Sequence, residues 1–69
     1  MDKHIRIILP AVRANTRMSQ QEFADKIGVS RETIANWESG KGEPTMTHLR
    51  KMSEISGIPM DFIWHEKQS

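Results

Sequence analysis

Apolar residues recur at helical spacing along most of the chain, and capping residues and glycines separate the groups. The run Ser19-Gln-Gln-Glu22 has the form of a capping box, in which the Ser19 and Glu22 side chains each accept a hydrogen bond from a free backbone N–H. Three apolar residues follow at helical spacing: Phe23, Ala24 and Ile27. Gly28 can adopt the left-handed conformation that ends a helix, so the pattern predicts a helix over 20–27.

A second helix begins almost immediately. Ser30 is a preferred N-cap residue and stands two positions after Gly28. The helix that it starts should continue to Ser39, where Gly40 stops it. The sequence therefore predicts two short helices joined by a very tight turn.

Two more helices are predicted after the loop over 40–44. Thr45 caps the first and Gly57 ends it, and its apolar residues are Met46, Leu49, Met52 and Ile55. Ile58-Pro59 then opens a short last helix, because proline is tolerated in a first helical turn. Four large apolar residues belong to it: Met60, Phe62, Ile63 and Trp64.

The N-terminal segment is open to two interpretations. Ile5, Leu9 and Val12 suit one face of a helix, but Pro10 cannot occupy a helix interior without loss of a hydrogen bond. The helix therefore starts near Ile7 or bends at the proline. The stretch KHIRIIL alone could instead form an edge strand.

The chain length and charge restrict the class of protein. Sixty-nine residues without cysteine make one small domain over 1–69, stabilised by packing or self-association instead of disulfides, with a disordered tail expected over 66–69. No apolar stretch approaches the ~20 residues of a membrane span, and no signal-peptide pattern is present, so we expect a cytoplasmic protein. The net charge of +1 is too small to indicate or exclude a nucleic-acid partner.

Two short helices joined by a glycine-containing turn form a helix-turn-helix over about 19–39, a unit that places its second helix in the major groove of DNA. At about 100° per residue, the second helix has two different faces. One face carries Arg31, Glu32, Ala35 and Asn36, and the other carries Thr33, Ile34 and Trp37. Ile34 and Trp37 can therefore pack on the preceding helix while the polar face stays exposed.

The polar face has side chains that suit DNA bases. Arginine can bind guanine O6 and N7, asparagine can bind adenine N6 and N7, and glutamate can accept from cytosine N4, each good pair contributing about 1–3 kcal/mol of discrimination. Ala35 could contact a thymine methyl group or allow the helix to lie deep in the groove. The sequence thus predicts base contacts from Arg31, Glu32 and Asn36, although solvated surface residues are the simpler alternative for any short helix.

The chain resembles the Cro/repressor, or Xre-like, helix-turn-helix family of phage and bacterial regulators, and the stretch that carries the resemblance is SQQEFADKIGVSRETIANWESGKGEPT. The family's recurring small, glycine, aliphatic and aromatic positions are held here by Ala24, Gly28, Ile34 and Trp37. The resemblance covers nearly the whole chain. It implies an all-α, lambda-repressor-like domain of five helices that binds double-stranded DNA as a homodimer and needs no cofactor.

The resemblance also implies roles for individual residues. Base contacts are implied for Arg31, Glu32 and Asn36, with Ala35 close by. Phosphate contacts are implied for Ser19, Gln20, Ser30, Thr33 and Lys41. Arg13 and Glu38 match a pair that forms a partly buried ion pair in relatives. Two positions depart from the family pattern: Pro10 interrupts the first helix, and Ser56 stands where leucine is common.

The apolar C-terminal residues predict contact with a second subunit. Phe62, Ile63 and Trp64 are consecutive, and three large residues in a row cannot all face inward on one helix. We therefore expect one or more of them in a dimer interface, with the others in the core. A two-fold dimer would match two half-sites about 34 Å apart on a near-palindromic operator.

Other classes of function fit less well. His4, His48 and His65 are isolated and no cysteine is present, so no metal site is predicted. The GKGEP loop lacks the phosphate-binding-loop pattern, and a catalytic triad has no scaffold here, so we do not expect an enzyme. The function predicted is a transcriptional regulator, most simply a repressor that occupies its operator without an effector domain. The alternative is a protein-interaction module, such as an antitoxin that docks a toxin through its apolar C-terminal surface.

Overall fold

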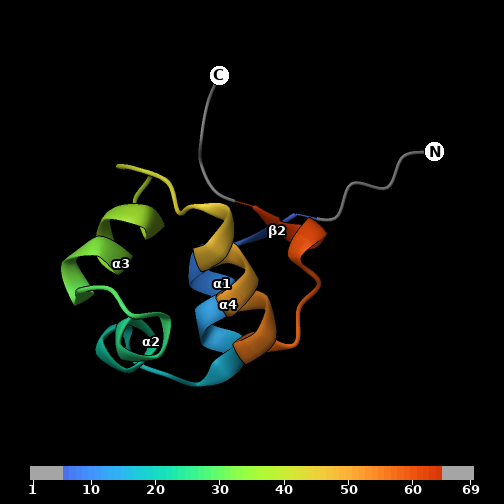
Figure 1. Ribbon diagram of the computed structural model, residues 1–69, viewed down its shortest axis with the longest axis horizontal. Helices are drawn as coiled ribbons and strands as arrows, with labels where there is room; N and C mark the ends of the chain where they lie inside the picture. The colour runs from blue at the N-terminus through green and yellow to red at the C-terminus, as the bar shows by residue number, and fades with distance from the viewer. Residues whose placement is uncertain (1–5, 65–69) are drawn as a thin grey trace.

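The computed structural model describes residues 6–64 of the chain. In chain order the elements are β1 (Ile7–Ile8), α1 (Leu9–Thr16), α2 (Gln20–Ile27), α3 (Arg31–Glu38), α4 (Met46–Ser56), the 3-10 helix η1 (Met60–Phe62) and β2 (Ile63–Trp64). Figure 1 shows α1 and α4 packed side by side in the middle of the molecule, with α2 and α3 together at one end and β2 at the other. The predicted tail over 66–69 lies outside the described residues.

The caps that the sequence predicts for α2 and α3 are confirmed. Ser19 Oγ accepts from the Glu22 N–H at 3.1 Å, and Glu22 Oε1 accepts from the Ser19 N–H at 2.8 Å. Gly28 ends α2 in the left-handed conformation with a φ of 93°. Ser30 Oγ accepts from the N–H of Thr33 at 3.1 Å and begins α3. The α3 helix ends one residue earlier than predicted, because Ser39 is its C-cap.

The α4 helix also has the predicted ends. Thr45 Oγ1 accepts from the His48 N–H at 3.3 Å, and Gly57 ends the helix with a φ of 78°. Ser56, which departs from the family pattern, stabilises the end of α4 and the turn that follows it. Its hydroxyl donates to the carbonyl of Met52 at 2.7 Å and accepts from the N–H of Ile58 at 3.1 Å.

The structure decides between the two interpretations of the N-terminal segment. Residues Ile7–Ile8 form a short strand, so the edge-strand alternative is right for these two residues only, and the helix begins at Leu9. Pro10 is in the first turn of α1, where backbone N–H groups have no partner within the helix, so its missing N–H costs nothing. The helix ends at Arg17, which has a φ of 64°.

The prediction of a fifth α-helix at the C-terminus is wrong. Only Met60–Phe62 form a helical turn, of the 3-10 type, and Ile63–Trp64 then form β2. This strand pairs with β1 in a parallel register that places Ile7 opposite Ile63 and Ile8 opposite Trp64. The pairing joins opposite ends of the described chain, so local helix propensity is overridden by a long-range contact that also favours β-branched isoleucine.

The core lies between the four α-helices and the small sheet. Its buried residues are Leu9, Val12, Phe23, Ala24, Ile27, Ile34, Trp37, Met52 and Ile63. Of the three C-terminal residues predicted to be divided between the core and a dimer interface, Ile63 lies in the core of its own chain. Its side chain is only 8% exposed within its own chain, because a strand instead of a helix turns it toward α1. Met46, predicted on the apolar face of α4, is the first residue of that helix and is 60% exposed.

Candidate nucleic-acid interface

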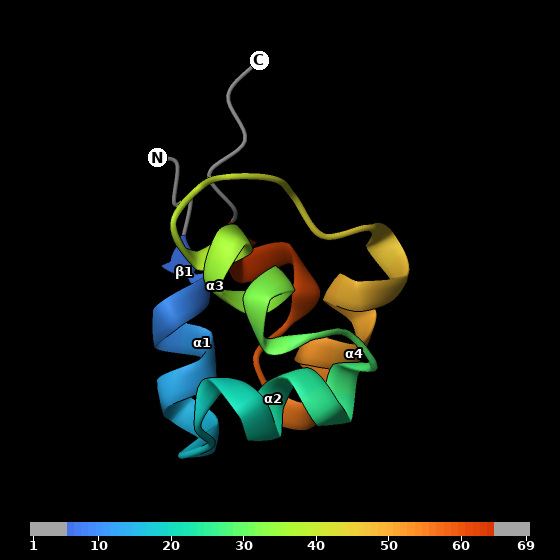
Figure 2. The same cartoon turned by 90° about the vertical axis from the view of Figure 1, so that its left-hand side faces the viewer.

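The α2 and α3 helices form one packed unit with a three-residue turn. The backbone N–H groups of Gly28 and Val29 donate to the carbonyl of Ala24 at 2.8 and 3.0 Å. Ala24 itself is fully buried, and its small side chain lets the two helices approach closely. Figure 2 views the molecule from the side on which these helices lie, with α2 running across the lower part of the picture and α3 above it, between α1 and α4. This is the helix-turn-helix arrangement predicted from the sequence.

A lysine of α4 supports the turn. The Nζ atom of Lys51 donates to the carbonyl of Ile27 at 3.3 Å. Carbonyl groups at a helix C-terminus lack partners within the helix and carry partial negative charge, so an ammonium group stabilises them. Sequence reasoning missed this contact because the two residues are 24 positions apart and no local pattern relates them.

The two faces of α3 are divided as predicted. Ile34 and Trp37 are only 1% and 7% exposed and belong to the core. Arg31 and Glu32 are exposed, while Ala35 and Asn36 are half-buried on the same helix. The helix is therefore anchored on one side and presents polar groups on the other.

The loop after α3 is tied to the end of that helix. The carbonyl of Asn36 accepts from the backbone N–H of Lys41 at 2.7 Å and from the hydroxyl of Ser39 at 3.1 Å. These bonds keep the exposed Lys41 side chain beside the C-terminus of α3. The ring of Trp37 also packs on His48 with centroids 4.9 Å apart, which connects the start of α4 to α3.

His48 has a capping role that sequence reasoning also missed. Its Nδ1 accepts from the backbone N–H of Thr45 at 3.2 Å, so Thr45 and His48 form a second capping box. Histidine holds the position where glutamate or glutamine is usual. The spacing of three residues from Thr45 is the pattern that could have identified it.

The hydroxyl groups predicted to contact phosphates stand at the starts of the two helices. Ser30 Oγ and Thr33 Oγ1 are 2.9 Å apart at the start of α3. Ser19 occupies the equivalent cap position of α2 and is exposed. A helix N-terminus favours an anion, because its free N–H groups and dipole are positive.

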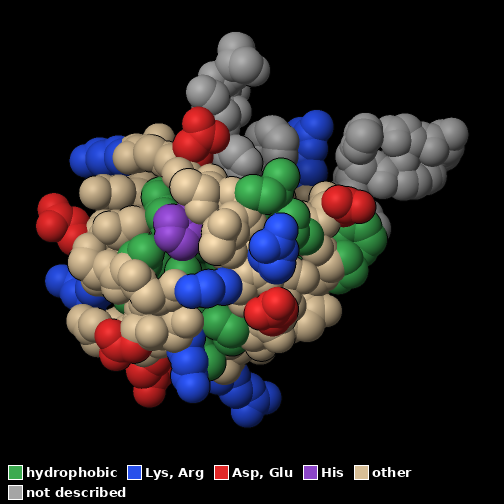
Figure 3. All heavy atoms as spheres, in the orientation of Figure 1, with side chains coloured by type: hydrophobic (Ala, Val, Ile, Leu, Met, Phe, Trp, Pro, Cys, Tyr) green, Lys and Arg blue, Asp and Glu red, His purple; other side chains and the backbone are tan. Residues whose placement is uncertain are grey.

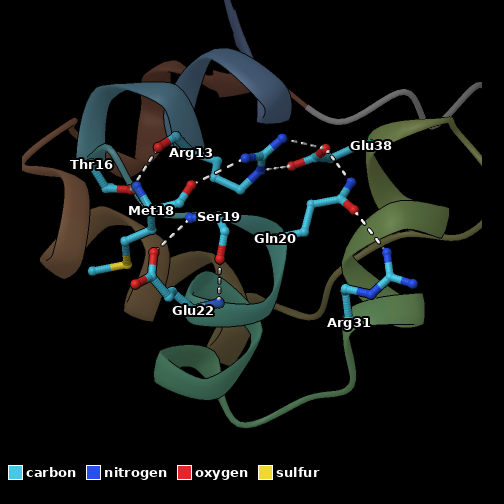
Figure 4. A network of polar contacts seen from close by, with 8 residues as sticks. All are labelled: Arg13, Thr16, Met18, Ser19, Gln20, Glu22, Arg31 and Glu38. Atoms are coloured by element: carbon cyan, nitrogen blue, oxygen red, sulfur yellow. Dashed lines mark hydrogen bonds and ion pairs between the residues drawn. The ribbon is translucent and has the colours of Figure 1, made fainter.

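A continuous set of polar contacts joins α1, α2 and α3, and Figure 4 shows its residues. Arg13 Nε donates to Glu38 Oε2 at 2.7 Å, and this is the ion pair that the family resemblance implied. Gln20 Nε2 donates to Glu38 Oε1 at 3.0 Å, and Gln20 Oε1 accepts from Arg31 Nη1 at 3.3 Å. Sequence reasoning identified all four residues but did not connect the ion pair with Gln20 or Arg31.

The ion pair at the centre of this set is well shielded. The side chains of Arg13 and Glu38 are 23% and 10% exposed. The hydrogen bonds that Arg13 donates to the Glu38 carboxylate raise the pKa of the Arg13 guanidinium above its ordinary value, against the opposing effect of burial. Arg13 also donates to the carbonyl of Met18 at 3.1 Å and so fixes the chain just before α2.

Comparison with known proteins now decides the family. The family model described as Helix-turn-helix matches residues 11–63, which is most of the chain. The chain belongs to this helix-turn-helix family. The matched region contains α2, α3 and α4 and most of α1, in agreement with the resemblance to Cro/repressor regulators.

Several curated members of this family of DNA-binding transcription regulators are similar to the chain. The prophage-derived HTH-type transcriptional regulator YonR of Bacillus subtilis is 38% identical over 80% of this chain and 51% of its own length. The HTH-type transcriptional activator BcrR of Enterococcus faecalis is 36% identical over 77% of this chain and 26% of its own length. The HTH-type transcriptional regulator MJ0272 of Methanocaldococcus jannaschii is 35% identical over 75% of this chain and 79% of its own length.

The chain spans about half or less of the length of YonR and BcrR. No solved structure gives a significant match to it. The names of these relatives state that they are transcription regulators, and the chain shares the helix-turn-helix region with them.

On the face of the molecule drawn in Figure 3, acidic and basic side chains alternate with apolar ones, so neither sign of charge dominates. Within residues 6–64, no helix is long and apolar enough to cross a membrane. The same part of the chain has no group of three or more histidine, cysteine, aspartate or glutamate side chains that could hold a metal ion.

Proposed function

We propose that the protein is a sequence-specific transcriptional repressor that acts in the cytoplasm and binds a near-palindromic operator as a homodimer, with α3 in the major groove. The observation that carries this proposal is the division of α3. Ile34 and Trp37 anchor the helix in the core, while Arg31 and Glu32 are exposed. A helix anchored in this way can enter a groove without losing its conformation.

Each residue on the exposed face has a proposed role in base recognition. Arg31 binds the O6 and N7 atoms of a guanine, and Asn36 binds the N6 and N7 atoms of an adenine. Glu32 accepts from a cytosine N4 or orients Arg31, because its charge would otherwise be repelled by phosphate. Ala35 lies near them and contacts a thymine methyl group or allows close approach.

The residues around this face are proposed to bind the DNA backbone. Lys41 is exposed beside the end of α3 and contributes a positive charge. The other proposed phosphate contacts lie at the starts of α2 and α3: Ser19, Gln20, Ser30 and Thr33. Backbone contacts of this kind determine register and affinity without reading sequence.

The dimer interface is proposed to include Phe62 and Trp64. Phe62 is half-buried in its own chain, and Trp64 is in β2. Ile63, buried in the core, is left out of this proposal. A two-fold dimer would place two copies of α3 about 34 Å apart, on successive major grooves of one DNA face.

Selection from a random DNA library tests recognition and dimerisation together. We expect a near-palindromic site with two half-sites, bound with an affinity that falls steeply as salt is raised. Fluorescence anisotropy on the selected site measures that dependence. An absence of binding at low salt would overturn the proposal.

A promoter reporter tests repression. The selected site is placed across a promoter, where a bound dimer would exclude polymerase. Reduced transcription supports repression, whereas increased transcription would assign the role of activator, as the name of BcrR states for that relative.

The second candidate function is a protein-interaction module, such as an antitoxin that docks a toxin through its apolar C-terminal surface. The observation that favours it is Ile8, which is 50% exposed on β1 beside the C-terminal strand. Substitution of Ile8 by serine separates the candidates. It should weaken a partner bound at this surface, whereas Arg31→Ala should weaken operator binding and leave that partner bound.

A further inference from the structure

Glu38 is shared between two partners, and this arrangement determines the orientation of a third side chain. One carboxylate oxygen, Oε2, accepts from Arg13 at 2.7 Å. The other, Oε1, accepts from Gln20 Nε2 at 3.0 Å and from Arg13 Nη2 at 3.2 Å. All of these groups point toward Glu38 in Figure 4.

The chemistry of the carboxylate determines which end of the Gln20 amide faces Arg31. An ionised carboxylate can only accept hydrogen bonds, so the NH₂ group of Gln20 must face Glu38. The amide oxygen of Gln20 then faces Arg31, whose Nη1 donates to it at 3.3 Å. If the amide were reversed, its NH₂ group would face the guanidinium of Arg31, and two donors would meet. Its oxygen would face the carboxylate of Glu38, and two acceptors would meet.

We propose that Glu38, acting through Gln20, is a positioning residue that sets the base preference of Arg31. Arg31 has five N–H donors in a rigid plane, and the bond to Gln20 uses one and restrains the plane. The remaining donors stay available for a base. Arg13 secures Glu38 and takes no part in the orientation itself. This inference rests on the proposed base contact of Arg31.

The first test compares two glutamines of the same helix. Gln20→Met removes the bridge and keeps the side-chain length. Gln21→Met is the matched control, because exposed Gln21 donates only to Asp25 on its own helix, at 2.9 Å. Base preferences of each variant are measured by selection from a library randomised over the operator. Gln20→Met should relax the preference at the Arg31 base pair by about tenfold. Gln21→Met should leave the whole profile unchanged.

The second test changes the polarity of the bridge. In Glu38→Gln, the new amide can accept from Arg13 while its NH₂ group donates to Gln20, which allows the Gln20 amide to reverse. The preference at the same base pair should relax again. Arg13→Met should lower thermal stability, but the Glu38 carboxylate still accepts from Gln20, so the preference should relax less than in Glu38→Gln. All measurements are made below the melting temperature of the least stable variant.

Variants of Arg31 separate this inference from the proposed function. Arg31→Ala should relax the preference at the same base pair, and Glu38→Gln added to it should relax that pair no further. If Arg31→Ala changes the profile but Gln20→Met and Glu38→Gln do not, the positioning role is overturned and the base contact stands. If Arg31→Ala leaves the profile intact, both are overturned.

Discussion

At the scale of single residues, α3 holds its two kinds of side chain apart, and this suits its proposed role in reading DNA. Burial of a large apolar side chain such as Ile34 contributes about 1.5–3 kcal/mol, which is a large share of the stability of so small a domain. Arg31, exposed on the same helix, contributes little to folding. Substitutions of the exposed residues should therefore change DNA binding while the fold persists.

Arg31→Ala and Lys41→Ala should have different effects on DNA binding. Arg31→Ala should cost about 1–3 kcal/mol and relax the preference at one base pair, because a bidentate base contact is lost. Lys41→Ala should weaken all sequences alike and reduce the slope of log affinity against log salt by about one. Anisotropy titrations over a salt series on single-base operator variants measure both effects. An equal loss of affinity for all operator variants on Arg31→Ala substitution would contradict the role of Arg31 as a base contact.

Arg17 is a position where substitution should stabilise the protein. Its φ of 64° is a left-handed conformation that costs about 1–2 kcal/mol for a residue with a Cβ atom, and its side chain is exposed. Arg17→Gly should raise the free energy of unfolding by up to about 1 kcal/mol, since part of the gain is offset by the greater entropy of unfolded glycine. Ala14→Gly, inside α1, is the control and should lower the free energy of unfolding by about 1 kcal/mol. Urea denaturation measures the two.

At the scale of elements, the helices depend on their caps and on packing. The helices α1, α2 and α3 have eight residues each, fewer than the ~12–15 that an isolated helix needs to be even marginally stable. Ser19, Ser30 and Thr45 each satisfy a backbone N–H at the start of a helix. Loss of one cap should therefore weaken one helix and, through the shared core, the whole fold.

The cap of α3 can be tested with two serines of the same region. Ser30→Ala should lower the free energy of unfolding by about 1 kcal/mol, because the N–H of Thr33 loses its acceptor. Ser39→Ala, at the opposite end of α3, is the control, because the Asn36 carbonyl also accepts from backbone N–H groups. This substitution should change the free energy of unfolding by less than about 0.5 kcal/mol. Equal effects in urea denaturation would show that the cap of α3 is unimportant.

At the scale of the whole molecule, three long-range contacts set the position of α3. The ion pair of Arg13 and Glu38 joins α1 to α3, and Lys51 joins α4 to the turn before α3. The pairing of β1 with β2 closes the opposite end of the core, where Ile7 is opposite Ile63. The α3 helix is thus supported by segments from the whole length of the described chain.

The role of Ile63 as a core residue can be distinguished from a role between subunits. Ile63→Ala should lower the free energy of unfolding of the monomer by about 2–5 kcal/mol, because a buried side chain is truncated. Ile63→Val should cost about 0.5–1.5 kcal/mol and remains measurable if the alanine variant does not fold. Ile8→Ala on the paired strand is the control with a smaller effect, since Ile8 is 50% exposed. A change in self-association without a change in stability would return Ile63 to the subunit interface.

The sequence alone determined the boundaries of α2 and α4, the start of α3 and the two faces of α3. Caps, glycines and apolar periodicity act within about four residues, so they can be identified from neighbouring positions. The capping box of Ser19 and the left-handed Gly28 are examples. The family resemblance added the ion pair of Arg13 and Glu38.

Only the tertiary structure decided the end of the chain and the connections of the polar residues. Local pattern favoured a helix through Trp64, but the partner of β2 is β1, at the other end of the described chain. Likewise, the amide of Gln20 acquires its orientation only when α1 and α3 bring Glu38 and Arg31 to its two ends. Strand pairing and shared hydrogen bonds depend on which distant residues meet, and the core that brings them together is a property of the folded chain.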